Sequence, residues 1–163
     1  MATRHDIPMG LRGAYLSMHR QTNVLLSRSG ITADQFVLLA LLEEDGGITQ
    51  QQLVRRADSD PNTVRAMLVL LERRGLVSRQ PHPTDGRARK VALTRKGKAA
   101  AKRSLAVTQG LRDRLYGLFS PEETASLAKF LHRISECMSQ SQTVNPSLRG
   151  RAVASRGPAG ANP

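Results

Sequence analysis

Three helix-start signals follow one another closely in this sequence, and they restrict the chain to a succession of short helices. In the stretch ITADQF, Thr32 can cap a helix while Gln35, three residues later, reaches back to it in a capping box. The stretch ITQQQL repeats this pattern with Thr49 and Gln52. In SDPNTV, Asp60 is a good N-cap and is followed by proline, which is favoured at the first helical position. Three successive helices are therefore expected.

Apolar faces and terminating glycines support these helices. The first, FVLLALLEED, is largely apolar and is stopped by Gly46, and the second runs to about Ala57. The third covers residues 61–74 and ends at Gly75. It places four apolar residues on one face at helical spacing, namely Val64, Met67, Leu68 and Leu71. That face is expected to pack against the neighbouring helices.

Two short strand-like segments, LVSRQ and KVAL, follow the third helix. They are joined by a charged segment with one Asp-Gly turn and three cations, Arg87, Arg89 and Lys90. Three short helices followed by a two-stranded hairpin are the arrangement of a winged helix-turn-helix, in which the second helix of the motif enters the major groove of DNA. The expected fold class is therefore mainly α with a small β-hairpin wing.

Longer helices are expected on both sides of this motif, at about residues 8–28, 94–118 and 121–138. The first and last carry apolar stripes that the small winged-helix lobe cannot cover, so we expect them to pack against a second copy of the chain. The expected domains are an N-terminal dimerisation helix at 1–30, a winged helix-turn-helix DNA-binding domain at 31–98, C-terminal dimerisation helices at 99–140, and a disordered basic tail at 141–163.

Positive charge is concentrated in the middle of the chain. The sequence has 25 Lys and Arg against 13 Asp and Glu, a formal net charge of +12. Residues 55–103 carry fourteen of these basic side chains and four of the acidic ones, which is +10 of the total. A charge of this size favours a polyanionic partner, either nucleic acid or an anionic membrane surface.

The third helix has the chemistry to read DNA on the side opposite its apolar face. Asn and Arg suit base edges, so we expect Asn62, Thr63, Arg65 and Ala66 to face the major groove. The start of this helix also favours a nearby phosphate. The hairpin cations can reach phosphates and the adjacent minor groove. The alternative for Arg87 and Arg89 is a solvated charge run, which their concentration on one motif disfavours.

The stretch DPNTVRAMLVLLERRGLVSRQPHPTDGRARKVALTRKG resembles the MarR family of transcription regulators, and the likeness extends over about residues 8–140. The resemblance implies an obligate homodimer in which the first and last helices interleave. It also implies that Thr63 and its neighbours read the major groove, while Arg87, steadied by Asp85, enters the minor groove. Two positions depart from the family pattern, because Ala66 and Gly86 stand where arginine is common.

These observations favour a sequence-specific dimeric regulator bound to a pseudo-palindromic operator, a repressor relieved by a small effector such as an aromatic compound. The alternative is a winged-helix module for protein interaction that has lost DNA readout. Tyr15 and His19 share a face of the first helix and could line an effector pocket. The favoured alternative for both residues is packing in an interface, with the imidazole of His19 hydrogen bonded.

Other functional classes find little support. The four histidines are scattered, the carboxylates form no convincing pair, and no phosphate-binding glycine loop follows a strand, so no enzyme, metal site or cofactor is expected. Cys137, the only cysteine, could sense oxidants, but a buried packing thiol is the favoured reading. With no signal peptide and no apolar run of about 18 residues, a cytoplasmic protein without membrane contact is expected.

Overall fold

The computed structural model describes residues 5–81 and 89–143. Contacts within the chain group it into an N-terminal unit, residues 1–114, and a C-terminal unit, residues 115–163. The domain boundaries expected at 30, 98 and 140 concern DNA-binding and dimerisation roles, and they stay a prediction. The tail expected from residue 141 lies almost entirely outside the described residues.

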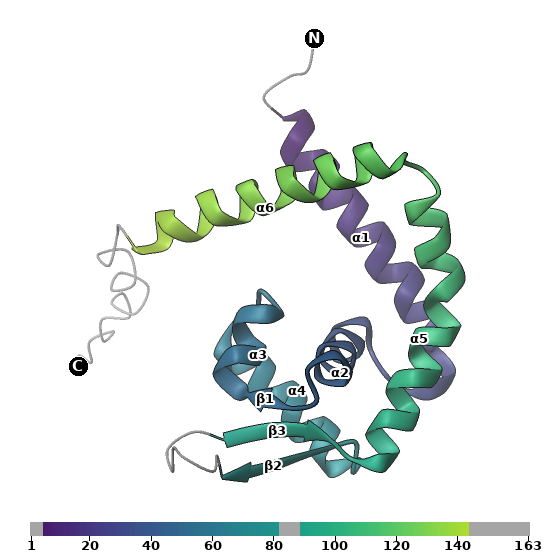
Figure 1. Ribbon diagram of the computed structural model, residues 1–163, viewed down its shortest axis with the longest axis vertical. Coiled ribbons are helices and arrows are strands. Elements are labelled where there is room, and N and C mark those ends of the chain that lie inside the picture. The colour runs from purple at the N-terminus through teal and green to yellow at the C-terminus, as the bar shows by residue number, and fades with distance from the viewer. Residues whose placement is uncertain (1–4, 82–88, 144–163) are drawn as a thin grey trace, which may run out of the picture. The chain divides into compact units, whose positions relative to one another are not determined.

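Helices dominate the N-terminal unit, as the fold class predicts, and a small sheet accompanies them (Figure 1). The helices are α1 (Asp6–Leu26), the short 3-10 helix η1 (Ser27–Ser29), α2 (Ala33–Asp45), α3 (Gln50–Arg56), α4 (Pro61–Arg73) and α5 (Arg95–Tyr116), whose last two residues fall in the C-terminal unit. The strands are β1 (Ile48–Thr49), β2 (Val77–Pro81) and β3 (Arg89–Leu93).

The helix-start signals read from the sequence are confirmed as caps. Thr32 Oγ1 accepts a hydrogen bond from the Gln35 backbone N–H at 3.2 Å, and Gln35 Oε1 accepts the Thr32 N–H at 3.2 Å. Thr49 and Gln52 form the same reciprocal pair at the start of α3. Because each capping box satisfies two otherwise unpaired N–H groups with side chains three residues apart, the signal is local and is readable from the sequence.

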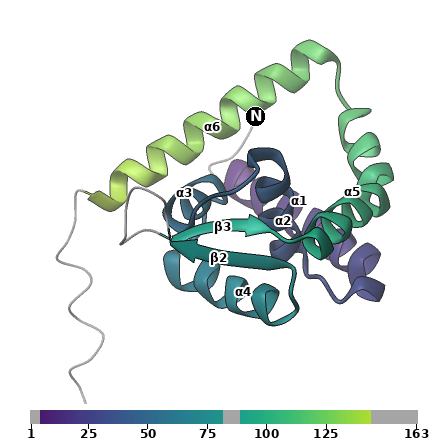
Figure 2. The ribbon, with the colours of Figure 1, turned by 60° about the horizontal axis from the view of Figure 1, so that its bottom comes forward.

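The sheet contains a strand that the sequence reading did not foresee. Its order is β1-β3-β2, all antiparallel, with Ile48 opposite Val91 and Val77 opposite Leu93. The predicted hairpin is β2 and β3, and Figure 2 shows it beside α4. β1 is only two residues long and carries the cap of α3, so its pairing arises from the tertiary structure and has no period-two signal of its own.

The core of the N-terminal unit joins the helices to the sheet. Residues from every layer are fully or almost fully buried in it, including Leu26, Leu38, Leu39, Leu42, Leu53, Val64, Leu68, Leu71, Val77 and Val91. Three of the four residues predicted to share the apolar face of α4 belong to this set, and Met67 packs against it while half-buried. Burial of this face fixes which side of α4 is left to the solvent.

α5 is continuous through its two glycines and packs closely on the segment that follows α4. A Cβ at Gly97 would lie 1.8 Å from the Leu76 carbonyl oxygen, so only glycine permits this approach. Gly110, by contrast, has open space around it. The Thr94 hydroxyl accepts the Gly97 N–H at 3.0 Å and donates to the Gly75 carbonyl at 2.7 Å, which caps α5 and ties it to the turn after α4.

The C-terminal unit consists, in its described part, of α6 (Pro121–Thr143) and the residues leading to it. The predicted capping box is confirmed, because Ser120 Oγ accepts the Glu123 N–H at 3.2 Å and Glu123 accepts the Ser120 N–H at 2.9 Å. Most of the predicted apolar stripe is exposed in the single chain, at Leu127, Phe130, Leu131 and Met138, and Ile134 is half-buried.

Cys137 is exposed, so the reading of a buried packing thiol is wrong for the single chain. Its sequence neighbours Ile134 and Met138 are apolar, which favours burial. Those residues lie on the same helix, and Met138 is itself exposed. An apolar stripe on a helix buries a neighbouring thiol only when another element covers it.

No single helix in the described part of the chain is both long and apolar enough to cross a membrane. α1 with η1 and α2 pass that test of length and composition only as a pair, and the pair is bent by 80°. Parts of α2 belong to the core of the N-terminal unit.

Candidate nucleic-acid interface

The start of α4 is held by a tight turn and an acidic cap. Asp58, between α3 and α4, adopts a left-handed conformation with φ of 47°, which Asp tolerates better than most residues. Asp60 Oδ1 then accepts the backbone N–H groups of Asn62 at 3.0 Å and Thr63 at 2.9 Å. The Thr63 hydroxyl and these N–H groups hold the pKa of Asp60 below its ordinary value.

This cap changes what the helix start can bind. Two of the first N–H groups of α4 already donate to a carboxylate, and that carboxylate carries a negative charge. A DNA phosphate at the same position has to compete with it. The start of α4 is therefore a weaker phosphate site than the sequence indicates.

The solvent-facing side of α4 carries the residues expected to read DNA. Asn62, Thr63, Arg65 and Ala66 are all exposed, while Val64, Leu68 and Leu71 on the opposite side are buried. The exposed side therefore presents an amide, a hydroxyl, a guanidinium and a methyl group, which are the groups that contact base edges in the major groove.

Arg73 extends this face and was missed by the sequence reading. It is exposed and follows Ala66 by seven residues, which is about two helical turns. The signal was available in the helical spacing, two residues before Gly75. We define the α4 face as Asn62, Thr63, Arg65, Ala66 and Arg73.

An ion pair joins α4 to the strands beside it. Arg79 of β2 donates from Nε to the Glu72 carboxylate at 2.9 Å, and a second bond from the same guanidinium reaches the same oxygen. Hydrogen bonding to Glu72 raises the pKa of Arg79 further above its ordinary value. The hairpin therefore has a side-chain link to α4 in addition to the shared core.

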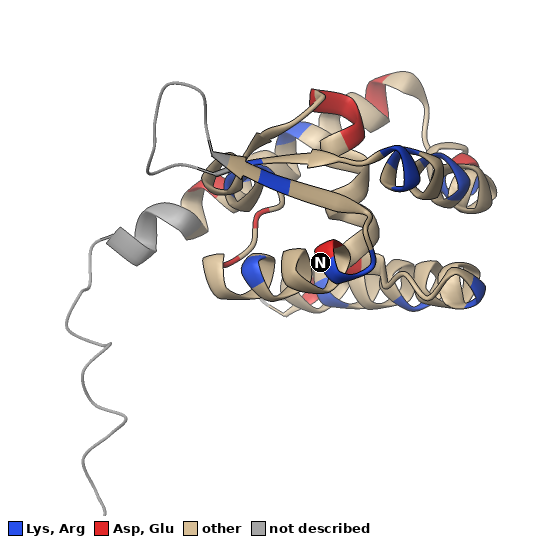
Figure 3. Cartoon of the chain, turned by 90° about the horizontal axis from the view of Figure 1, so that it is seen from below, with Lys and Arg blue, Asp and Glu red and all other residues tan. Residues whose placement is uncertain are grey.

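The structure places only part of the predicted wing site. Lys90 is exposed on β3, opposite Gln80 of β2. The backbone of Arg89 pairs with Pro81 at the end of the hairpin. Arg87 and Asp85 lie outside the described residues, so their roles stay predictions. Figure 3 marks the cations of the N-terminal unit, which include Arg65 and Arg73 on α4, Arg79 and Lys90 on the strands, and Lys96, Lys98, Lys102 and Arg103 on α5.

Tyr15 and His19 lie on α1, where their rings contact each other, and His19 also contacts Asp34 of α2. Their ring centroids are 5.5 Å apart. His19 Nε2 is 3.3 Å from Asp34 Oδ2, and its Nδ1 is 3.2 Å from the Asn23 side-chain nitrogen. The Asn23 carbonyl oxygen in turn accepts the backbone N–H of Ala33 at 2.9 Å, so the group joins α1 to the first turn of α2. A ligand-binding role for Tyr15 and His19 stays a prediction.

No candidate metal-binding site is present among the residues that the structure describes. There, no three His, Cys, Asp or Glu side chains come together as metal ligands would. The expectation that the protein uses no metal or cofactor stays a prediction.

Comparisons with known proteins agree with this geometry. A model of the MarR family matches residues 31–88, which contain the α4 face and strand β2. The HTH-type transcriptional repressor Rv2887 of Mycobacterium tuberculosis is 27% identical over 136 residues, covering 82% of this chain and 98% of that protein.

Two solved structures share the fold over most of the chain. A variant of Escherichia coli MarR in complex with operator DNA is 28% identical, with a TM-score of 0.69, and covers 82% of this chain and 99% of that chain. Bordetella bronchiseptica BpsR, studied for the regulation of its DNA binding by 6-hydroxynicotinic acid, is 25% identical, with a TM-score of 0.72 and coverage of 83% and 97%. The residues that match and the winged fold they form together establish that this chain belongs to the MarR family of transcription regulators.

Proposed function

We propose that the protein is a homodimeric repressor that binds a pseudo-palindromic operator through α4 and the β2–β3 hairpin. The observation that carries the proposal is the α4 face, where Asn62, Arg65 and Arg73 are exposed opposite a fully buried apolar side. A protein-interaction module would be expected to present apolar or acidic groups there. The basic middle of the chain supplies the sequence-independent attraction to phosphates.

Dimer formation is supported by apolar surface that the single chain leaves uncovered. On α1, Ile7, Met9 and Tyr15 are exposed, and α6 exposes Phe130 and Met138. Several large apolar side chains exposed on one helix are typical of an association site. A two-fold dimer then presents two α4 helices to one side of a duplex, which requires half-sites about 34 Å apart, one turn of DNA.

Repression relieved by a small effector is the finer part of the proposal. The regulation of BpsR by 6-hydroxynicotinic acid supports it by likeness. A pocket within the N-terminal unit supports it independently. We also propose that the protein acts in the cytoplasm, catalyses no reaction and requires no cofactor, since its proposed role needs only DNA, a second copy of the chain and an effector.

The experiment that tests the proposal is selection of bound sequences from a random duplex pool, followed by titration of the selected duplex at several salt concentrations. We expect an inverted repeat to emerge. If each subunit neutralises about three to five phosphates, the slope of log K against log salt is on the order of −6 to −9. Enrichment of no sequence, or binding that does not respond to salt, would favour the interaction module and refute the repressor.

A further inference from the structure

The first half of α5 is strongly cationic and contains no acidic side chain. Its five cations are Arg95, Lys96, Lys98, Lys102 and Arg103. The sequence has no Asp or Glu anywhere in residues 86–112. Within the described part of the chain, no ion pair joins any of these five cations to a carboxylate. Their charge is therefore left for a partner outside this part of the chain.

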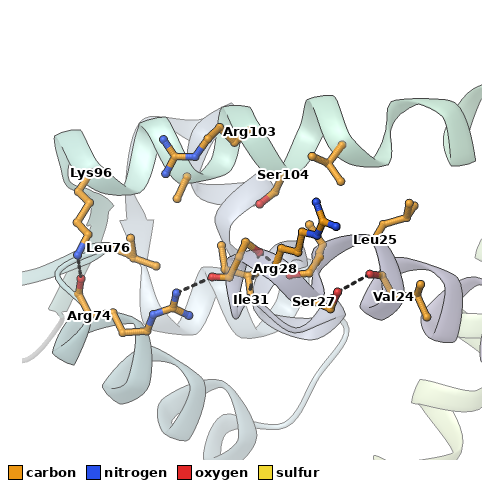
Figure 4. Close-up of a pocket in the computed structure, with 14 residues that line it drawn as sticks. Val24, Leu25, Ser27, Arg28, Ile31, Arg74, Leu76, Lys96, Arg103 and Ser104 are labelled. Atoms are coloured by element: carbon orange, nitrogen blue, oxygen red, sulfur yellow. Dashed lines mark hydrogen bonds between the residues drawn. The ribbon is translucent and has the colours of Figure 1, made fainter.

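Two of the five cations face the body of the N-terminal unit. Lys96 and Arg103 line a pocket of about 730 Å³ between η1 and α5, and Arg28 and Ser104 also belong to its lining (Figure 4). Lys96 Nζ donates a hydrogen bond to the Arg74 carbonyl at 2.9 Å, which Figure 4 shows as a dashed line. These two cations therefore belong to the side of α5 that is turned toward η1 and the end of α4.

The other three cations form one exposed stripe, which we call the α5 stripe: Arg95, Lys98 and Lys102. They stand at i, i+3 and i+7, so they share one face of the helix. All three are exposed, and none of them lines the pocket. The residue beside them on this face, Ala99, is exposed and small, so it does not cover the charged groups.

The α5 stripe is unfavourable for the helix that carries it. Arg95 and Lys98 lie at the start of α5, where the helix dipole disfavours cations, and no acidic residue stands in that turn. Lys98 and Lys102 are like charges at i and i+4, which also destabilises a helix. By contrast, α2 and α6 have acidic residues in their first turns, Asp34 and Glu122 among them. An arrangement that opposes local stability without a compensating contact is expected where function requires it.

The α5 stripe begins beside the end of α4. The Thr94 hydroxyl donates to the Gly75 carbonyl at 2.7 Å, and Gly97 packs against the Leu76 carbonyl. The first turn of α5 therefore lies against the segment that follows Arg73, the last residue of the α4 face. In Figure 3 the cations of α4, of the strands and of the start of α5 are seen from the same side. The stripe thus extends the cationic surface beyond the α4 face.

We infer that the α5 stripe binds the sugar–phosphate backbone of the same duplex that α4 reads, outside the base pairs that the α4 face contacts. The stripe spans about 10 Å along the helix, which is close to the rise of three base pairs at about 3.4 Å each. Such contacts add affinity and fix the register of the protein on the duplex, but they carry no sequence information. The inference rests on the proposed function and adds a second contact surface to it.

An anionic membrane is the other partner that three cations can attract. A helix that lies on a membrane inserts an apolar face that carries large side chains. On α5, Ala100 and Ala101 are buried in the core of the N-terminal unit, and the exposed Ala99 is too small to insert. Charge without an insertable apolar face favours DNA over a membrane.

The first test removes the charges of the stripe from the full chain. Arg95→Gln, Lys98→Gln and Lys102→Gln are combined in one triple variant, and its affinity for the selected duplex is titrated at several salt concentrations. We expect affinity at about 100 mM salt to fall at least tenfold and the slope of log K against log salt to become less steep by about 2 to 5. Unchanged affinity with an unchanged slope overturns the inference.

Two further readouts separate a backbone contact from a structural role. The melting temperature of the triple variant should stay level or rise, because like-charge repulsion is removed. Selection from the random duplex pool should return the same inverted repeat as for the wild type, because the base contacts are intact. A loss of affinity accompanied by a lower melting temperature refutes the inference, because the loss would then follow from damage to the fold.

A matched pair of single variants tests the position of the charge. Arg95→Gln and Arg114→Gln each remove one exposed arginine from α5, at its first and at its last turn. We expect Arg95→Gln to weaken duplex binding about threefold or more and Arg114→Gln to weaken it less than twofold. Equal losses in the two variants would show a general effect of net charge and would refute the stripe.

Failure of the inference can be told apart from failure of the proposed function. A triple variant that binds the inverted repeat as tightly as the wild type refutes the stripe and leaves the repressor standing. A wild type that binds every duplex equally, and loses that binding in the triple variant, refutes the repressor and leaves the stripe standing. Vesicles that contain phosphatidylglycerol serve as the membrane probe. Vesicle binding that only the triple variant loses, with duplex affinity unchanged, assigns the stripe to a membrane and overturns the inference.

Discussion

Arg79 of β2 and Glu72 of α4 are joined by two hydrogen bonds from one guanidinium to one carboxylate oxygen, of which the bond from Nε measures 2.9 Å. The pair crosses from the strand to the last turn of the helix. It therefore fixes the angle between the two elements that are proposed to contact neighbouring grooves of the same duplex.

Breaking this pair should affect DNA binding more than stability. Both side chains are partly exposed, so Arg79→Ala should cost no more than about 1 kcal/mol in the free energy of unfolding, measured by urea titration. Duplex affinity should fall about fivefold, because the shared core still holds the hairpin but the ion pair that orients it on α4 is lost. Glu72→Gln should lower duplex affinity in the same way, and Glu43→Gln, which removes the same charge at an exposed position of α2, is its matched control. An Arg79→Ala protein of normal affinity would show that packing alone positions the hairpin.

Asp60 should make the stability of α4 depend on pH. Its folded pKa is lowered from 3.8 by the hydrogen bonds from Thr63 and Asn62, so the ionised form stabilises the fold. That contribution is present above pH 3.8 and is lost as pH falls through the lower folded pKa. Asp60→Asn keeps a cap without the charge. The melting temperature of the wild type should exceed that of the variant at pH 6, and the gap should narrow toward pH 3.

The same substitution provides a test at the DNA surface. Asp60→Asn removes a negative charge from the start of α4. In the wild type this carboxylate competes with a DNA phosphate for the N–H groups of Asn62 and Thr63. Duplex affinity should therefore rise or stay level at neutral pH. Asp58→Asn, which removes the same charge two residues earlier, is the control for a general charge effect. A loss of affinity confined to Asp60→Asn would indicate that the carboxylate positions Thr63 for its contact.

The two glycines of α5 should respond in opposite directions to the same change. Gly97→Ala puts a Cβ where the Leu76 carbonyl stands, so the helix must move away and the melting temperature should fall by several degrees. Gly110→Ala meets open space and should stabilise the protein by about 0.5 to 1 kcal/mol, because alanine is the better helix former. Thermal unfolding followed by circular dichroism measures both. A stable Gly97→Ala protein would contradict the close approach of α5.

Arg65 and Arg87 should contribute to DNA binding in different ways. Arg65→Ala should cost about 1 to 3 kcal/mol and relax sequence preference at one position of each half-site. Arg87→Ala should cost a similar amount, with the loss largest on sites whose flanking minor groove is narrow. Neither should change the melting temperature much. Normal binding by Arg87→Ala counts against minor-groove insertion, and unfolding would show that the side chain is structural.

Charged residues on α6 should separate the dimer. Leu127 and Leu131 lie on its exposed apolar stripe, so Leu127→Glu with Leu131→Glu should yield monomers in sedimentation and abolish specific binding of an inverted repeat. Lys129→Glu, on the same helix between them, is the control for added negative charge. A wild-type chain that is monomeric at micromolar concentration would refute the dimer.

The parts of the fold that could be predicted from the sequence are those determined by neighbours in the chain. The caps at Thr32, Thr49, Asp60 and Ser120 depend on residues two or three positions away, and all four are present. The winged fold followed from the order of these elements. β1 could not be predicted in this way, because a two-residue strand exists only through its pairing with Val91 and Lys90.

The same distinction between what could and could not be predicted from the sequence holds for the candidate site. The α4 face follows from helical periodicity and is exposed as expected, apart from the omission of Arg73. The pocket between η1 and α5 had no sequence signal, because Arg28 and Ser104 are far apart in the chain and neither belongs to a motif. Cys137 was misplaced because the sequence shows which residues are apolar but does not show what covers them.

The central place of β3 in the sheet also has a consequence for synthesis of the chain. Ile48 and Val77 find their strand partners only in Val91 and Leu93, which leave the ribosome after α2, α3 and α4 have all emerged. Until then the apolar sides of those helices have no sheet to close over them. The nascent lobe therefore passes through a stage with exposed core, and a chain terminated before β3 should be a substrate for chaperones and proteases.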